Sequence, residues 1–237
     1  MIASKMMHPT EAKTLTEAAY RAIRQHIISG HAPAASRLQI SELCKMCSSS
    51  ASAIREALSR LASEGLVTIT EQKGFRVAPM SEIEFEDITS LRILLEQDAL
   101  RRSIQLGGDD WEARIVAAHH KLARTEKRLK AGEVSLIDEW EQRNREFHDS
   151  LVSACGSDWL LRLRKLLFDH SQRYRLQSLT GGPVMRDSSI EHKRLLTSAM
   201  ERKADEVCRL IARHFSTTYE DYKVGKRIAQ RTRRAAR

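Results

Sequence analysis

The sequence predicts a mainly α-helical protein with a little β-structure near its N-terminus. Apolar residues recur every three or four positions along most of the chain, and alternation is confined to residues 67–77. Aromatic residues make up only 5% of the chain, against 41% hydrophobic residues in all. This balance is expected of helices packed through Leu, Ile and Ala. We therefore expect three helices and a β-hairpin, followed by an all-helical bundle of six helices.

The first two helices are predicted over residues 14–29 and 38–47. The first carries Ile23 on its apolar side and arginines on the other, and Gly30 ends it. The second is shorter and directs Leu43 inward. Both therefore have one face that must pack against a third element.

Residues 50–65 are predicted to form that third helix. Ser50 or Ser52 can accept a hydrogen bond from the free amides of its first turn, and Gly65 ends it where a left-handed residue is usually needed. The core-facing residues recur at helical spacing: Ile54, Ala57, Leu58 and Leu61. Ser52 and Arg55 lie on the opposite side.

The alternating stretch 67–77 is predicted to be a β-hairpin with a basic tip. Three helices and a hairpin within about 65 residues form a winged helix-turn-helix. The third helix has a polar, cationic edge that fits a DNA major groove, and it carries no acid, base or nucleophile typical of catalysis. We expect DNA contacts from the third helix (Ser50, Ser52 and Arg55), from the hairpin (Lys73 and Gly74) and from basic residues near phosphate (Arg21, Lys45 and Arg76).

The rest of the chain is predicted to be helical, interrupted at glycines and polar turns. The six expected helices cover residues 82–106, 109–131, 134–155, 158–179, 187–202 and 204–222. We divide the chain into a DNA-binding domain (1–80), a helical domain (81–222) and a tail (223–237). The tail has seven basic residues and no acidic ones, and we expect it to be disordered because it cannot bury apolar surface.

Composition limits the class of protein further. The net charge of +9 comes from the first 80 residues (+4), the body (−2) and the tail (+7), so a polyanion such as DNA is expected at one end. No apolar run approaches the roughly 18 residues that span a bilayer, and the first nine residues lack the apolar core of a signal peptide. With four cysteines and no such signal, we expect a cytoplasmic protein without membrane association.

The helical domain has polar residues where its helical period calls for apolar ones. These are Arg92, Asn144, His148, His192 and His214. Buried polar groups need partners, so several in one bundle suggest a shared polar cavity. Three imidazoles and one carbonyl oxygen can bind a divalent transition metal. Single hydrogen-bonded core histidines are the alternative, because His119 and His170 also fall on apolar stripes.

The sequence also carries motifs of a known family. They are Ile54-Arg55-Glu56-Ala57-Leu58, Glu64-Gly65-Leu66-Val67 and Gly74-Phe75-Arg76-Val77 in the first part, and Asn144-Arg145-Glu146-Phe147-His148, Glu191-His192 and His214 in the second. With them the chain resembles the GntR-type bacterial transcription regulators of the class with an FCD (FadR C-terminal) effector domain. The form Ser50-Ala51-Ser52-Ala53-Ile54-Arg55-Glu56 is most similar to a subgroup that includes the carbon-starvation-induced repressor.

The resemblance implies roles for particular residues. Asn144, His148, His192 and His214 would hold a divalent transition metal (zinc, or a metal like nickel or manganese). Arg92 would face an acidic effector, with Arg173 or Arg175 as a second contact. The subgroup implies a small organic acid, such as a dicarboxylate.

Two departures from the family pattern matter. Many relatives have Asp where this chain has Asn144, and losing that charge weakens a hard oxygen ligand. Many also begin the recognition helix with Ser-Arg-Thr-Pro, whereas this chain has Ser50-Ala51-Ser52-Ala53. The arginine that often reads a guanine is absent, so Ser50, Ser52 and Arg55 are expected to carry the contacts.

We expect a homodimeric repressor of catabolic genes, not an enzyme. It would bind a near-palindromic double-stranded operator, with half-sites about one helical turn apart, and a small organic acid would release it. One alternative is a metal-sensing regulator without an organic effector. Another is a metalloenzyme fused to a DNA-binding head, but no glutamate adjoins two histidines as in H-E-x-x-H.

Overall fold

The computed structural model describes residues 9–70, 74–181 and 187–235, and the side chains of 15–70, 74–176 and 187–227. The chain divides into two compact units, Met1–Ser81 and Glu82–Arg237. Among the described residues, no helix combines the length and the apolar character needed to cross a bilayer.

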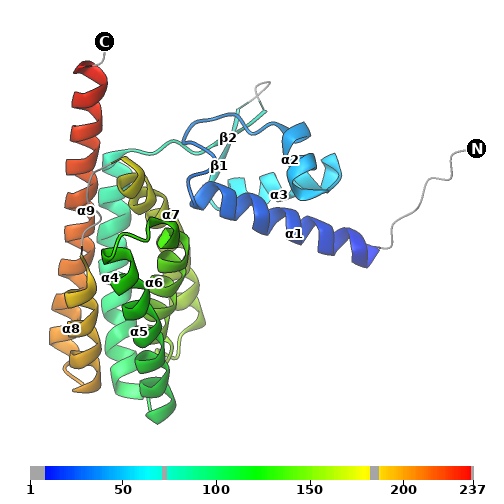
Figure 1. Ribbon diagram of the computed structural model, residues 1–237. Helices are drawn as coiled ribbons and strands as arrows, with labels where there is room; N and C mark the ends of the chain where they lie inside the picture. The colour runs from blue at the N-terminus through cyan, green and yellow to red at the C-terminus, as the bar shows by residue number, and fades with distance from the viewer. Residues whose placement is uncertain (1–8, 71–73, 182–186, 236–237) are drawn as a thin grey trace, which may run out of the picture. The chain divides into compact units, whose positions relative to one another are not determined.

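The first unit is a winged helix-turn-helix, as predicted. Its helices are α1 (Pro9–Ile28), α2 (Ile40–Cys47) and α3 (Ala51–Ser63), and its strands are β1 (Val67–Thr70) and β2 (Gly74–Val77) (Figure 1). The strands pair antiparallel, with Val67 opposite Val77. The apolar faces of all five elements meet in one core, which includes Ile23, Ile27, Leu43, Ile54, Leu58, Leu61 and Val77.

Both ends of α3 follow from its sequence. The Ser50 hydroxyl accepts a hydrogen bond from the Ala53 amide at 3.3 Å, which satisfies one of the free donors of the first turn. Beyond the helix, Gly65 has a φ of 76°, a conformation that glycine adopts without steric cost. The chain is thereby turned directly into β1.

The segment before α2 holds β2 in place. The Leu38 amide donates to the Phe75 carbonyl at 2.9 Å, and the Val77 amide donates to the Ser36 carbonyl at 2.9 Å. The hairpin is therefore bound to the helical part of this unit through its backbone as well as through its side chains.

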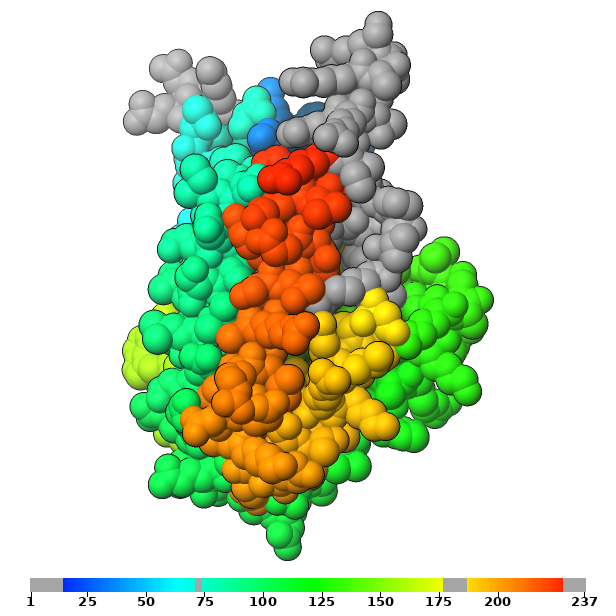
Figure 2. Space-filling model, turned by 90° about the vertical axis from the view of Figure 1, so that its left-hand side faces the viewer, coloured from blue at the N-terminus to red at the C-terminus, as the bar shows by residue number. Residues whose placement is uncertain are grey.

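The second unit is all helical, as predicted. Its elements are α4 (Glu82–Leu106), α5 (Asp109–Lys130), a 3-10 turn η1 (Val134–Leu136), α6 (Ile137–Val152), α7 (Asp158–Gly181), α8 (Ser189–Met200) and α9 (Ala204–Ala235). Figure 2 shows α9 across the middle of one face of this unit, between α4 and α8, and both helices contact it. The core contains Trp111, Phe147, Leu151, Leu195 and Ile211.

The end of α9 differs from the prediction. The helix continues to Ala235, whereas we expected regular structure to end after Tyr222. The last residues are mostly Lys, Arg, Ala and Gln, which are good helix formers. Extending an existing helix by one residue adds one hydrogen bond without a new nucleation cost, so a buried face is not required.

Candidate metal centre and its surroundings

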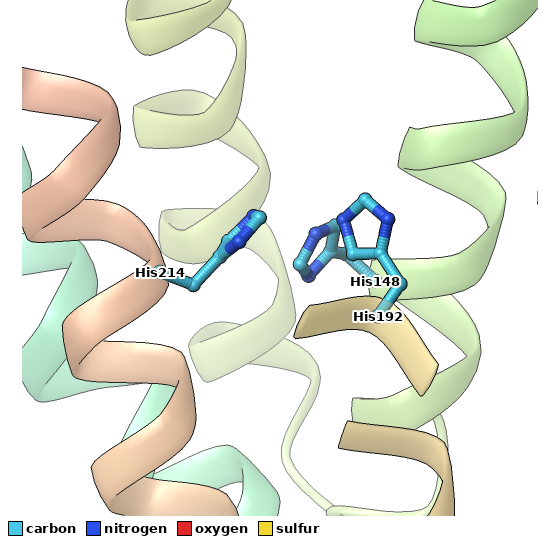
Figure 3. A group of neighbouring side chains, drawn as sticks. All are labelled: His148, His192 and His214. Carbon is cyan, nitrogen blue, oxygen red and sulfur yellow. The ribbon is translucent and has the colours of Figure 1, made fainter. Parts of the chain in front are cut away.

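Three buried histidines from three helices meet in the second unit. His148 lies on α6, His192 on α8 and His214 on α9, and one nitrogen from each lies within 4.8 Å of the others (Figure 3). Their ring centroids are 5.0–5.5 Å apart. Of five histidines on apolar stripes, the fold therefore brings these three together.

Carboxylates hold two of the three imidazole rings from outside. Nδ1 of His192 lies 2.7 Å from Oε1 of Glu126, and Nδ1 of His214 lies 2.6 Å from Oε2 of Glu191. When Nδ1 donates to a carboxylate, the lone pair of the neutral ring remains on Nε2, as in histidine ligands of metals. Nε2 of His192 is buried without a hydrogen-bond partner among the described residues.

Asn144 precedes His148 by one turn of α6, so both side chains project from the same face of the helix. The Oδ1 atom of Asn144 and the Nδ1 atom of His148 are buried and have no hydrogen-bond partner within the described structure. Such atoms are costly to bury unless a ligand satisfies them. Three imidazoles and an amide oxygen are a donor set suited to a divalent transition metal, so these residues fit one.

Electrostatics favour the same use of the cluster. Burial, followed by the neighbouring His214 and His192, holds the pKa of His148 well below its ordinary value. His148 is therefore neutral at pH 7. A metal can bind it without first displacing a proton.

Arg92 of α4 lies beside this cluster. Its guanidinium carbon is 3.8 Å from the centre of the Phe215 ring, and that ring lies 5.9 Å from His148 and 5.7 Å from His214. Burial, followed by the charge of Arg175, lowers the pKa of Arg92 to about 9. Arg92 is still a cation at neutral pH.

The charge of Arg92 is not neutralised by a direct partner in the described structure. Glu96 and Glu141 attract it, but Arg164 binds Glu96 at 2.6 Å and Arg175 binds Glu141 at 2.9 Å. The Nε atom of Arg92 is buried without a hydrogen-bond partner among the described residues. A buried cation with an open donor is suited to binding an anion.

The other two predicted effector residues lie on α7. Arg175 packs 4.7 Å from the centre of the Phe168 ring, and Arg92 lies 5.2 Å from the same ring. Because Arg175 is bonded to Glu141 and Ser171, much of its charge and donor capacity is used. Arg173 is buried as well, and this burial lowers its pKa.

Sequence reasoning missed one residue of the cluster, Glu126. It is 5% exposed and contacts His192 from α5, a helix to which we had assigned no site residue. A signal was present, because Glu126 interrupts the apolar stripe formed by Leu122 and Leu129. Glu191 was part of the family motif, but it had been given no role.

In the first unit, the predicted DNA-contacting residues have different surroundings. Ser52, Arg55 and Lys45 are exposed, while the Ser50 hydroxyl is used by the helix cap. The others are distributed as follows: Arg21 pairs with Glu17 at 2.7 Å, Arg76 donates to the Ala35 carbonyl at 2.8 Å, Gly74 begins β2, and Lys73 lies outside the described residues.

A hollow of about 340 Å³ joins two of these predictions. Arg55 of α3 and Gly74 of β2 both line it, together with Arg37 and the first turn of α2. Gln39, at the N-cap of α2, makes no side-chain hydrogen bond to that turn. Two cations and free backbone amides therefore surround one small depression.

Comparison with known proteins identifies the family. Residues 15–77 match the family "Bacterial regulatory proteins, gntR family", and residues 87–217 match the FCD domain, which alone covers more than half of the chain. The chain belongs to the GntR family and carries an FCD domain. It is a DNA-binding transcriptional regulator and not an enzyme.

This GntR regulator has characterised and uncharacterised relatives. It is 37% identical over 206 residues to the uncharacterized HTH-type transcriptional regulator BphR of Paraburkholderia xenovorans (strain LB400), covering 87% of this chain and 84% of BphR. It is 35% identical over 202 residues to the HTH-type transcriptional repressor GlaR of Escherichia coli (strain K12), covering 84% and 91%. The solved structure of E. coli McbR/YncC shares its fold, with a TM-score of 0.72 at 18% identity over 92% of this chain and 98% of that one.

Proposed function

We propose that this regulator is a homodimeric repressor of catabolic genes, released from its operator by a small organic acid. The observation that carries the proposal is the buried cation Arg92 beside a cluster of neutral metal-binding side chains. Such a site suits an anion. The repressor assignment is supported by the similarity to GlaR, which is named a repressor. The protein would act in the cytoplasm.

The ligand side of the proposal assigns two positive centres. Asn144, His148, His192 and His214 would hold a divalent transition metal, with zinc as the first candidate and nickel or manganese as others. The bound metal would supply a Lewis-acidic charge. Arg92 would donate hydrogen bonds to a carboxylate, with Arg173 or Arg175 in support, and two positive centres favour a dicarboxylate.

The DNA side of the proposal rests on α3 and the hairpin. Ser52 and Arg55 are exposed and would read base edges in the major groove. The depression lined by Arg37, Arg55 and the first turn of α2 suits a backbone phosphate. In a homodimer these features recur by two-fold symmetry, which favours a near-palindromic operator with half-sites about one helical turn apart.

The two sides must be coupled for the acid to act as a signal. The acid can shift the regulator only if it binds one arrangement of the chain better than the other. Arg92 lies on α4, the first helix after the DNA-binding unit. A change at this helix is therefore the shortest covalent route from the ligand to the DNA-binding unit.

A thermal-shift screen of small organic acids tests the ligand side. We expect at least one acid to raise the melting temperature of the metal-loaded protein, and a chelator or Arg92→Ala to remove the rise. Arg124→Ala, at an exposed position on α5, is the matched control and should leave the rise unchanged. A response to metal but to no acid would instead identify a metal sensor without an organic effector.

A further inference from the structure

The helix α4 has a second apolar face that nothing in the described structure covers. Leu94 is 64% exposed and Leu91 is 43% exposed, although the opposite side of the helix packs into the core through Ala99 and Leu100. Single exposed leucines are common, but neighbouring ones on a long helix are characteristic of an interaction surface.

The apolar surface continues onto α7. The two helices are antiparallel neighbours, because Arg164 of α7 pairs with Glu96 of α4 and Tyr174 of α7 stacks on Phe85 of α4, with ring centres 4.4 Å apart. Leu163 precedes Arg164 and is 48% exposed. We call the surface formed by Leu91, Leu94 and Leu163 the leucine face.

Charges along α4 indicate what kind of partner this face fits. The first turns carry Glu82, Glu84, Glu86 and Asp87, while Arg101 and Arg102 lie near the other end. Leu94 is the middle residue of Glu82–Leu106. If a second α4 packed antiparallel across a two-fold axis at Leu94, the acidic end of each helix would lie beside the basic end of the other.

We propose that the leucine face is the contact between two copies of this chain, with the two-fold axis at Leu94. A symmetric contact must be complementary to itself, and α4 meets this condition in both its apolar centre and its opposite charged ends. The inference rests on the proposed function in one respect, since it assumes that the regulator acts as a dimer. It adds where the dimer forms.

This placement has a consequence for regulation. Arg92 and Leu94 belong to the same turn of α4 and face opposite sides, one toward the proposed ligand and the other toward the second copy. A ligand that shifts this helix would act on the dimer contact directly. It would not need a separate relay through the core.

The test uses two opposite charges at one position. Full-length Leu94→Glu and Leu94→Lys are each measured by light scattering after size exclusion, beside the wild type. Each variant places two like charges across the axis, so its dimer should dissociate with a constant raised more than about tenfold. An equimolar mixture pairs Glu with Lys and should recover the dimer mass, which a misfolded variant would not do.

Ile190→Glu is the matched control, because Ile190 is an equally exposed residue (62%) on α8, outside the leucine face. It should leave the mass of the dimer unchanged. Wild-type dimers that persist in both Leu94 variants would overturn the leucine face but leave a dimeric regulator intact. A wild-type monomer would overturn both this inference and the dimer in the proposed function. Failure of the mixture to recover dimers would place the axis elsewhere.

Discussion

At the scale of single residues, the histidine cluster has an unusual distribution of charge. Its four inner side chains, Asn144 and the three histidines, are neutral donors, and the negative charges lie one step outside them. Glu126 and Glu191 contact the Nδ1 atoms of His192 and His214. Two outer carboxylates can balance a divalent cation and fix the orientation of two rings, so the lost charge at Asn144 is partly offset.

Restoring the acid at the inner position should strengthen metal binding. We expect Asn144→Asp to bind Zn²⁺ about tenfold more tightly, because the charge of the ligand set strongly affects the affinity for a cation. Asn144→Ala should bind more weakly than the wild type. Competition with a chromophoric chelator measures all three affinities. Equal affinities would show that residue 144 is not a ligand.

Removing an outer charge should have the opposite effect. Glu126→Gln should lower Zn²⁺ affinity by about 10- to 100-fold, because the amide can also donate and no longer fixes the ring of His192 in one tautomer. Glu133→Gln, at an exposed position in the turn after α5, serves as the control. If both variants bind Zn²⁺ like the wild type, Glu126 has only a packing role.

At the scale of elements, α3 shows what local sequence can establish. Its cap at Ser50 and its end at Gly65 were both predictable, because each depends on contacts within a few residues. The same reasoning placed Ser50 among the DNA-contacting residues, but its hydroxyl oxygen is already used by the cap. The sequence alone does not separate the two roles.

A pair of variants separates them. Ser50→Ala should lower the free energy of unfolding by about 1 kcal/mol through the loss of the cap, as measured by urea denaturation. Ser52→Ala removes a hydroxyl from the exposed face of the same turn. It should leave stability nearly unchanged and weaken operator binding. Equal losses of stability would contradict the assignment of the cap to Ser50.

The last helix shows where the pattern failed. We expected α9 to end where its apolar stripe ends, but the helix continues to Ala235. A stripe reports which residues pack, and a helix can continue beyond its packed part when its residues have high helix propensity. The helices α4 and α5 were predicted almost to the residue because glycines or acidic first turns mark their ends.

At the scale of the whole molecule, the site could be predicted only in part. Asn144 and the three histidines were identified from their helical period together with the family motifs. Period alone did not separate them from His119 and His170, since it reports that a residue faces inward and not which partner it meets. Glu126 was missed for the same reason, because it meets His192 from a helix 66 positions earlier in the sequence.

The coupling between ligand and DNA is the central claim, and it belongs to the whole molecule. The most direct test is fluorescence anisotropy with a labelled duplex from upstream of the regulator's own gene, using Zn²⁺-loaded, full-length protein and a panel of dicarboxylates. We predict salt-dependent binding stronger than to a scrambled duplex, and release by at least one acid from the wild type but not from Arg92→Ala. Equal binding to both duplexes, or equal release of the wild type and the variant, would contradict the account.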